Sequence, residues 1–270
     1  MDDWLTTNRR MWDERVPLHA DSAFYDMEAF KAGRPSLLPH EVEELGALDG
    51  CRVLHLQCHL GLDTLDLARL HPTVHVTGVD FSAAAVDAAA TLARELRLAE
   101  RSRFVVGDVY HAVDLLGAER FDVVYTGKGA LLWLPDMDGW AAEVAGLLAP
   151  GGFLYLTELH PVADALGNDE PRPVRDYFAT EPEIVEDPGS YAVPGAATEH
   201  NTRYEWLHPL SRVITALLGA GLQLELLHEW DFAMDGLHSW LVQGSDGRYR
   251  WPPGSGTLPL MYSLKAVRPS

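Results

Sequence analysis

Two neighbouring segments decide the fold of this chain: Cys51-Arg-Val-Leu-His-Leu-Gln-Cys-His-Leu-Gly-Leu-Asp-Thr64 and His75-Val-Thr-Gly-Val-Asp80. The apolar residues of the first segment predict a buried strand, and Gly61 permits the tight turn after which helical spacing resumes. The second segment predicts another strand, which ends at Asp80. An acid at the carboxyl end of this strand accepts hydrogen bonds from both hydroxyls of a ribose. The turn in the first segment and Asp80 in the second therefore predict a nucleoside site.

The composition limits the partners that this chain can have. The 270 residues, 47% of them hydrophobic, suffice for one large α/β domain with an insertion. Lys and Arg number 21 against 40 Asp and Glu, which gives a formal charge of -19. Such a surface repels a polyanion at long range, so we expect no nucleic-acid partner.

The N-terminal sequence and the cysteines indicate a compartment. Residues 1–7 lack the basic and then apolar pattern of a signal, and no apolar stretch reaches about 18 residues. We therefore expect a cytoplasmic protein without a membrane partner. Cys51 and Cys58 lie too far apart along one strand to form a disulfide, and free thiols fit a reducing compartment.

Strands and helices alternate after residue 51, which predicts a parallel sheet with right-handed crossovers. The expected strands are 52–57, 74–79, 104–108, 121–125, 153–157 and 222–230, and the expected helices are 61–70, 82–98, 110–116, 136–148 and 211–220. Ser82 and Ser211 are expected to cap their helices. Residues 231–257 show no helix, so the last strand, 258–267, is expected to return antiparallel.

The fold class expected is therefore α/β, a doubly wound, mostly parallel, seven-stranded Rossmann-like sheet with an antiparallel last strand. Residues 1–50 form an N-terminal helical arm, with one helix entering at Pro39. Residues 51–160 form the cofactor-binding core, and residues 210–270 complete its sheet. Proline is frequent and helical periodicity is lost over 161–209, which is typical of a lid or substrate-binding insertion.

The helix-less return, together with Pro150-Gly-Gly152 before the fifth strand, resembles the class I S-adenosylmethionine-dependent methyltransferases over roughly residues 49–266. In that family the turn after the first strand reads acid-x-Gly-x-Gly-x-Gly. The matching positions here are Gln57, His59, Gly61 and Asp63, so one glycine is kept. Gln57 replaces the acid that holds the methionine ammonium, and its carbonyl still accepts such a bond, less strongly. We interpret this turn as a subfamily variant.

The resemblance implies S-adenosylmethionine as the cofactor. Asp80 matches the ribose acceptor, Gly107-Asp108-Val109 the segment at the adenine edge, and Thr126-Gly127-Lys128 the stretch that passes the sulfonium. Phe81 is expected to flank the adenine. The full set of cofactor-binding residues implied is Gln57, Cys58, His59, Gly61, Asp80, Phe81, Ser82, Gly107, Asp108, Val109, Thr126 and Gly127.

The sulfonium is already a strong electrophile, so the protein has to align an acceptor and remove a proton where one is lost. The candidate catalytic residues are His160, just after the fifth strand, and Tyr204 and His208 in the insertion. Two alternatives remain open: His160 caps a strand end, or the insertion residues form a packed hairpin. The candidate substrate-binding residues are Tyr25, Lys128, Trp133 and Trp206, for which a core or solvated-loop role is the alternative.

Other chemistries fit the sequence less well. His55, Cys58 and His59 suggest zinc, but their spacing belongs to a strand and a loop and no second pair of cysteines exists. No phosphate loop or Gly-x-Ser-x-Gly motif occurs. The function predicted is methyl transfer to a small molecule, in a setting such as secondary metabolism. The alternatives are an NAD(P)-dependent oxidoreductase and a non-catalytic nucleoside-binding regulatory protein; the acceptor atom and the oligomeric state stay open.

Overall fold

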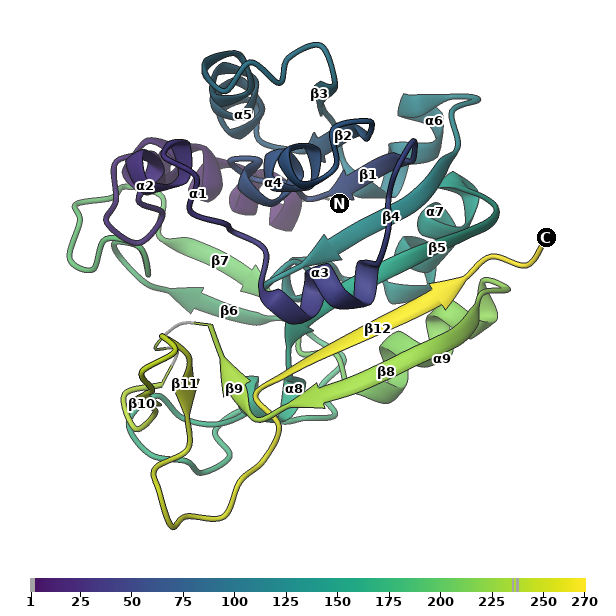
Figure 1. Ribbon diagram of the computed structural model, residues 1–270. Helices are drawn as coiled ribbons and strands as arrows, with labels where there is room; N and C mark the ends of the chain where they lie inside the picture. Colours follow the sequence, from purple (N-terminus) through teal and green to yellow (C-terminus); the bar gives the residue numbers. More distant parts are fainter. Residues whose placement is uncertain (1–2, 235, 237) are drawn as a thin grey trace.

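The computed structural model describes residues 3–234, 236 and 238–270. Its centre is a seven-stranded sheet in the order β3-β2-β1-β4-β5-β12-β8 (Figure 1). The strands are β1 (Arg52–Leu56), β2 (His75–Asp80), β3 (Ser102–Val106), β4 (Phe121–Gly127), β5 (Leu148–Leu159), β8 (Gln223–Trp230) and β12 (Met261–Val267). β12 pairs antiparallel with both β5 and β8, while β1 to β5 run parallel. The predicted fold class is confirmed.

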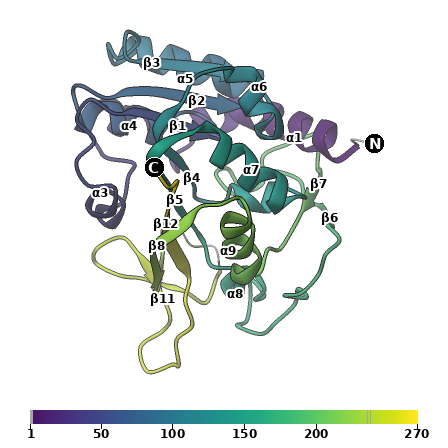
Figure 2. The same cartoon turned by 90° about the vertical axis from the view of Figure 1, so that its right-hand side faces the viewer.

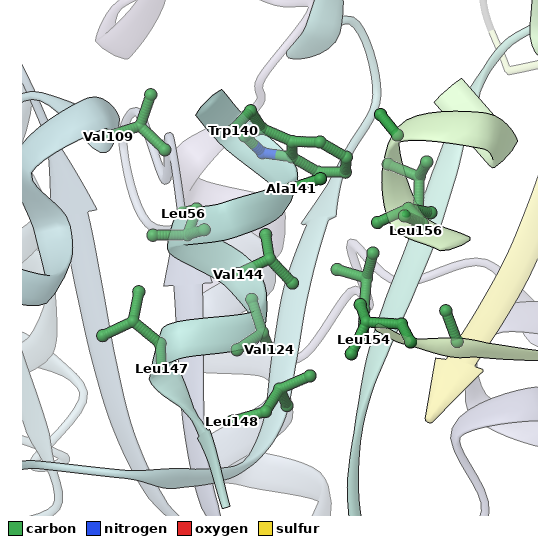
Figure 3. Packing of buried hydrophobic residues seen from close by; sticks show 14 of the residues in the cluster. Leu56, Val109, Val124, Trp140, Ala141, Val144, Leu147, Leu148, Leu154 and Leu156 are labelled. Carbon is green, nitrogen blue, oxygen red and sulfur yellow. The ribbon is translucent and has the colours of Figure 1, made fainter. Parts of the chain in front are cut away.

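Helices cover both faces of the sheet, with α7 and α9 on one side and α3 and α4 on the other (Figure 2). The sheet helices are α4 (Leu62–Leu70), α5 (Ala83–Glu95), α6 (Ala112–Leu116), α7 (Met137–Leu147) and α9 (Leu210–Gly219). Side chains alternate along each strand, so Val53 of β1 packs with α4 while Leu54 and Leu56 pack with α7. In Figure 3 Trp140 and Val144 of α7 lie against the strands, and both are fully buried.

Two segments lie at the edge where the parallel strands end. The arm contains α1 (Asp3–Ala20), α2 (Met27–Lys31) and α3 (Pro39–Leu45), with Pro39 at the start of its helix as predicted. The insertion contains α8 (Pro161–Asp164) and a hairpin of β6 (Glu183–Glu186) with β7 (Thr202–Glu205). α1 contacts β7, and both lie to the left of the sheet in Figure 1.

Several local predictions need correction. The last long helix starts at Leu210 with Pro209 as its N-cap, so Ser211 lies inside the first turn and is not the cap. By contrast, Ser82 caps α5 as predicted, since its hydroxyl accepts a hydrogen bond from the Ala85 N–H. The segment before β12, expected to be an irregular connection, forms a small sheet. Its strands are β9 (Phe232–Ala233), β10 (Val242–Gln243) and β11 (Tyr249–Arg250).

Candidate cofactor and acceptor site

The turn after β1 adopts a left-handed backbone at three alternate positions. The φ angles are 58° at Gln57, 46° at His59 and 73° at Gly61. A Cβ on Gly61 would lie 2.8 Å from the Ala89 Cβ and equally close to the Phe104 ring, so packing requires glycine there. Gln57 and His59 adopt the same left-handed backbone region at some cost in strain. The turn can therefore form with a single glycine, at position 61.

Gln57 has one half of its amide paired and the other half free. Its Nε2 donates a hydrogen bond of 2.8 Å to the carbonyl of Ala130, whereas its buried Oε1 has no hydrogen-bond partner among the described residues. An acceptor buried without a donor costs about 1–3 kcal/mol. An ammonium would supply the missing donor, so the chemistry of Gln57 fits the methionine end of the implied cofactor.

Asp80 lies at the end of β2 and is nearly fully buried. Its two oxygens accept backbone hydrogen bonds from His59 (2.8 Å) and Ser82 (2.9 Å). Burial raises the pKa of Asp80 to about 6, against the lowering effect of those N–H groups. A carboxylate has about four lone-pair sites, so two remain for ribose hydroxyls. The Ser82 hydroxyl in turn donates to Asp13 of α1 at 2.5 Å, which brings the arm to this edge.

The other predicted cofactor-binding residues follow the ends of β3 and β4. The Gly107 N–H donates to the Asp80 carbonyl, and Asp108 caps the short helix η1 (Val109–His111). A Cβ on Gly127 would lie 2.4 Å from the Thr157 carbonyl oxygen, so the end of β4 also requires glycine. The Thr126 hydroxyl is buried and has no hydrogen-bond partner among the described residues. Phe81 is half-buried beside them.

Cys58 packs as a small buried residue rather than acting as a nucleophile. A Cβ on Gly78 of β2 would lie 2.8 Å from the Cys58 sulfur, which shows how close the two strands' ends are. Burial raises the pKa of the Cys58 thiol well above its ordinary value, so it stays protonated. Cys51 and Cys58 are both free thiols, and no group of three or more potential metal ligands occurs among the described side chains.

Six aromatic and imidazole side chains gather over the turn, and we call them the ring cluster. They come from the arm, the turn, the helix η2 (Leu131–Trp133) and the insertion, and they are Trp12, His19, Tyr25, His59, Trp133 and Tyr191. The Trp12 ring centroid lies 5.0 Å from that of His59 and 5.2 Å from that of Trp133. The cluster covers the turn on which the cofactor edge is built.

Hydrogen bonds tie the ring cluster together. His19 Nδ1 lies 2.9 Å from His59 Nε2, and His19 Nε2 lies 2.6 Å from the Ser190 hydroxyl. The phenols of Tyr25 and Tyr191 also share a hydrogen bond. The sequence predicted Tyr25, His59 and Trp133 at this site, and the structure brings these three together.

Sequence reasoning missed the rest of this face of the arm. Asn8, Trp12, Arg15 and His19 recur at the spacing of one helix face, a signal that could have found them. Asn8 exchanges two hydrogen bonds of 2.9 Å with the backbone of Tyr204 in the insertion. Arg15 donates to the carbonyl of His200, and Glu14 accepts from two amides beside it. The arm thus holds the insertion closed along the length of α1.

The candidate catalytic residues do not meet at the turn. His160 accepts a hydrogen bond from the Val162 N–H at Nδ1, while its Nε2 lies 3.0 Å from a carboxylate oxygen of Glu229. That geometry favours the strand-cap interpretation. His208 bonds through Nε2 to the Leu134 carbonyl at 2.7 Å, and burial lowers the pKa of His208 to about 4.

Tyr204 and Trp206 belong to the packed side of the insertion. Their rings stack with centroids 6.5 Å apart, and Trp206 packs edge-on against Trp4 of the arm. Trp206 and His208 line a cavity of about 40 Å³ together with Leu131 and Glu158. A volume of that size holds a few water molecules and is too small for an acceptor. Trp206 and His208 therefore pack against η2 and the residue that follows it, and they support that loop.

Lys128, which was predicted to bind substrate, is paired inside the protein. Its ammonium lies 3.0 Å from Glu41, 3.0 Å from Asp63 and 3.1 Å from the Ser36 carbonyl. Those contacts use its three donor hydrogens inside the protein. The two carboxylates raise the pKa of Lys128, so the side chain is a buried cation that joins the arm to α4 and β4.

Glu158 is a site residue that sequence reasoning passed over. Its buried carboxylate accepts backbone hydrogen bonds from residues 129, 130, 131 and 159. It thereby fixes the loop after β4, which carries the Ala130 carbonyl bonded to Gln57 and the Trp133 ring. No periodicity or motif signals a carboxylate that organises a loop.

Comparison with known proteins agrees with this geometry. Residues 53–152 match the family model described as a methyltransferase domain. The chain is 29% identical over 214 residues to trans-aconitate 2-methyltransferase from Deinococcus radiodurans, covering 79% of this chain and 72% of that protein. These findings show that residues 53–152 carry a methyltransferase domain and that the chain is similar to a known methyltransferase over most of its length. It is an S-adenosylmethionine-dependent enzyme.

Solved structures share the fold at low identity. The CcbJ methyltransferase from Streptomyces caelestis superposes with a TM-score of 0.62 at 20% identity, over 96% of this chain and 97% of that one. The glycopeptide N-methyltransferase MtfA with S-adenosylhomocysteine gives a TM-score of 0.55 at 19% identity, over 92% and 98% of the two chains. Across the described part of this chain, no helix is both long and apolar enough to cross a membrane.

Proposed function

We propose that this enzyme transfers the methyl group of S-adenosylmethionine to a small-molecule acceptor, which reacts beneath the arm and the insertion. The ring cluster is the observation that carries the proposal. Six rings from four separate segments close over the turn that holds the methionine end of the cofactor. A macromolecular acceptor would have to displace all of them, which favours a small-molecule acceptor.

Each part of the site has a defined task in this proposal. When bound, the cofactor supplies an activated methyl group on a sulfonium. Gln57 Oε1 accepts a hydrogen bond from its ammonium, and the Asp80 carboxylate accepts those of its ribose. The ring cluster excludes water and holds the acceptor in line with the methyl group.

The sheet argues against the oxidoreductase alternative. The dinucleotide-binding fold carries a sixth strand that continues the parallel order. Here β12 instead runs antiparallel between β5 and β8. The regulatory alternative predicts a different outcome: such a protein would bind the cofactor through Gln57 and Asp80 but transfer no methyl group.

Methyl transfer to pools of candidate acceptors tests the proposal. The purified enzyme is incubated with S-adenosylmethionine carrying a labelled methyl group and, separately, with phenols, amines, carboxylic acids, a protein extract or RNA. We expect label in a low-molecular-mass product and S-adenosylhomocysteine in equal amount. Label found in protein or RNA alone, or none with any pool, would contradict the proposal.

A further inference from the structure

Two imidazoles of the ring cluster and one neighbouring hydroxyl form a continuous line of hydrogen bonds. The line runs from His59 Nε2 to His19 Nδ1 (2.9 Å) and from His19 Nε2 to the Ser190 hydroxyl (2.6 Å). It crosses from the cofactor turn to the arm and on to the insertion. His19 in the middle is fully buried, whereas Ser190 at the end is partly exposed.

This line can be hydrogen-bonded in either direction. A neutral imidazole has one donor and one acceptor nitrogen, and a hydroxyl both donates and accepts. In one arrangement His59 donates to His19, which donates to Ser190. In the other, Ser190 donates to His19, which donates to His59. One proton moves along each bond, while a proton enters at His59 Nδ1 and the Ser190 hydroxyl loses its own proton. These moves together convert the first arrangement into the second, and each group ends neutral.

We propose that His59, His19 and Ser190 form a neutral proton relay, which carries the acceptor's proton out of the closed site during methyl transfer. The inference rests on the proposed function and deepens it. His59 is the catalytic residue of the relay, because it is the member on the cofactor turn. His19 and Ser190 act through it and are positioning residues.

The step balances in atoms and charge. The acceptor atom forms a bond to the methyl carbon as the carbon–sulfur bond breaks, and the electron pair of that bond stays on sulfur. The acceptor's proton passes to His59 Nδ1, the His59 Nε2 proton to His19 Nδ1, and the His19 Nε2 proton to Ser190. The Ser190 hydroxyl proton leaves to a solvent water molecule.

The surroundings explain why the relay has to work without charge. Burial, with a smaller contribution from the Arg15 cation, lowers the pKa of His19 to about 4, and burial lowers the pKa of His59 to about 3. A lone imidazolium would be costly here, so His59 acting by itself would be a weak base. Three ionisable side chains face the two imidazoles: Arg15, Tyr25 and Tyr191. Asp80 is also close, because its carboxylate accepts a hydrogen bond from the backbone N–H of His59.

Nitrogen NMR of the protein labelled on its histidine rings tests the relay without any acceptor. At pH 7 we expect His19 and His59 to be neutral, with ring-nitrogen shifts between those of the two pure tautomers. His59→Gly should move His19 to a single tautomer, and glycine suits the φ of 46° at that position. The control is His238→Gln, a buried histidine bonded to the Ala163 carbonyl in another part of the molecule.

A single fixed tautomer of His19 in the wild type, or His19 signals unchanged by His59→Gly, would overturn the relay. The acceptor identified by the methyl-transfer experiment then supplies the kinetic arm. We expect His59→Gly to lower kcat by about 10²- to 10⁴-fold, the range for loss of proton transfer. S-adenosylhomocysteine affinity should change by less than about threefold, since the Gln57 and Asp80 contacts remain, and added imidazole should restore part of kcat.

The outcomes separate this inference from the function on which it rests. No turnover of any acceptor by the wild type would refute the proposed function, and the NMR spectra would then decide by themselves whether protons move along the line of hydrogen bonds. Full kcat in His59→Gly with an active wild type would refute the relay alone. An equal loss of kcat and of S-adenosylhomocysteine affinity, without imidazole rescue, would assign His59 a structural role and would also overturn it.

Discussion

Gln57 combines a paired amide nitrogen with an unpaired, buried amide oxygen at the end of β1. The bond to Ala130 fixes which end of the amide faces the site, so the residue presents an acceptor and no donor. A carboxylate at this position would instead face the Ala130 carbonyl and be repelled by it. The loop after β4, held by Glu158, therefore explains why glutamine suits this variant of the turn.

Replacing Gln57 with Met should weaken binding of the methionine end of the cofactor. A hydrogen bond to a charged group contributes about 1.5–3 kcal/mol, so we expect S-adenosylhomocysteine affinity to fall about tenfold or more in calorimetry. Methylthioadenosine lacks the ammonium, so its affinity should be unchanged. Gln243→Met, at an exposed position on β10, is the control. Equal losses for both ligands would mean that Gln57 only supports the loop.

Lys128 shows what sequence alone could not give at this scale. Its position after β4 was predicted, but the direction of its side chain depends on two carboxylates, Glu41 and Asp63, that reach it from the arm and from α4. His160 is similar, because its partner Glu229 lies on a strand far along the chain. Burial and pairing decide the role of such residues, and both are long-range properties.

At the scale of elements, apolar periodicity predicted all seven strands of the main sheet and the order of the helices between them. It placed β3 two residues late, because Ser102 and Arg103 at its start carry no apolar signal. It missed β9, β10 and β11, since two-residue strands have no period to detect. It also predicted a helical arm but not the face of α1 that holds the insertion.

Removing the contacts of Asn8 should release the insertion from the arm. Asn8→Leu leaves the Tyr204 N–H and carbonyl without the two partners that they have now, at about 1 kcal/mol or more for each. We expect limited proteolysis within residues 168–200 to be about tenfold faster or more, with the sheet still folded by circular dichroism. Asn168→Leu, at an exposed position of the insertion, is the control. Equal cleavage rates in the two variants would show that α1 does not hold the insertion.

At the scale of the whole molecule, the arm, the turn after β1 and the insertion meet above the carboxyl edge of the sheet. The ring cluster is their common contact, and α1 connects it to Asp80 through Asp13 and Ser82. A ligand that lies under the cluster is therefore enclosed by segments that are far apart in the sequence. Opening the insertion and releasing the ligand then become one event, with one free-energy change.

Amide hydrogen exchange measures that coupling. The amides of Glu199 and His200 donate to Glu14, and that of Tyr204 donates to Asn8, so they exchange when the insertion leaves the arm. If S-adenosylhomocysteine has to leave before opening, a concentration of 100 times its Kd should slow their exchange about a hundredfold, or about 2.7 kcal/mol.

The amide of Gly244 provides the internal control for this measurement. It bonds to the Arg248 carbonyl in the small sheet and should exchange through local opening that the ligand does not touch. Slowing confined to the three insertion amides would mean that the arm and the insertion close over the cofactor as one unit. The opposite result is that exchange stays unchanged at all four amides in protein that calorimetry shows to be saturated. The ligand would then bind and dissociate without separation of the insertion from the arm.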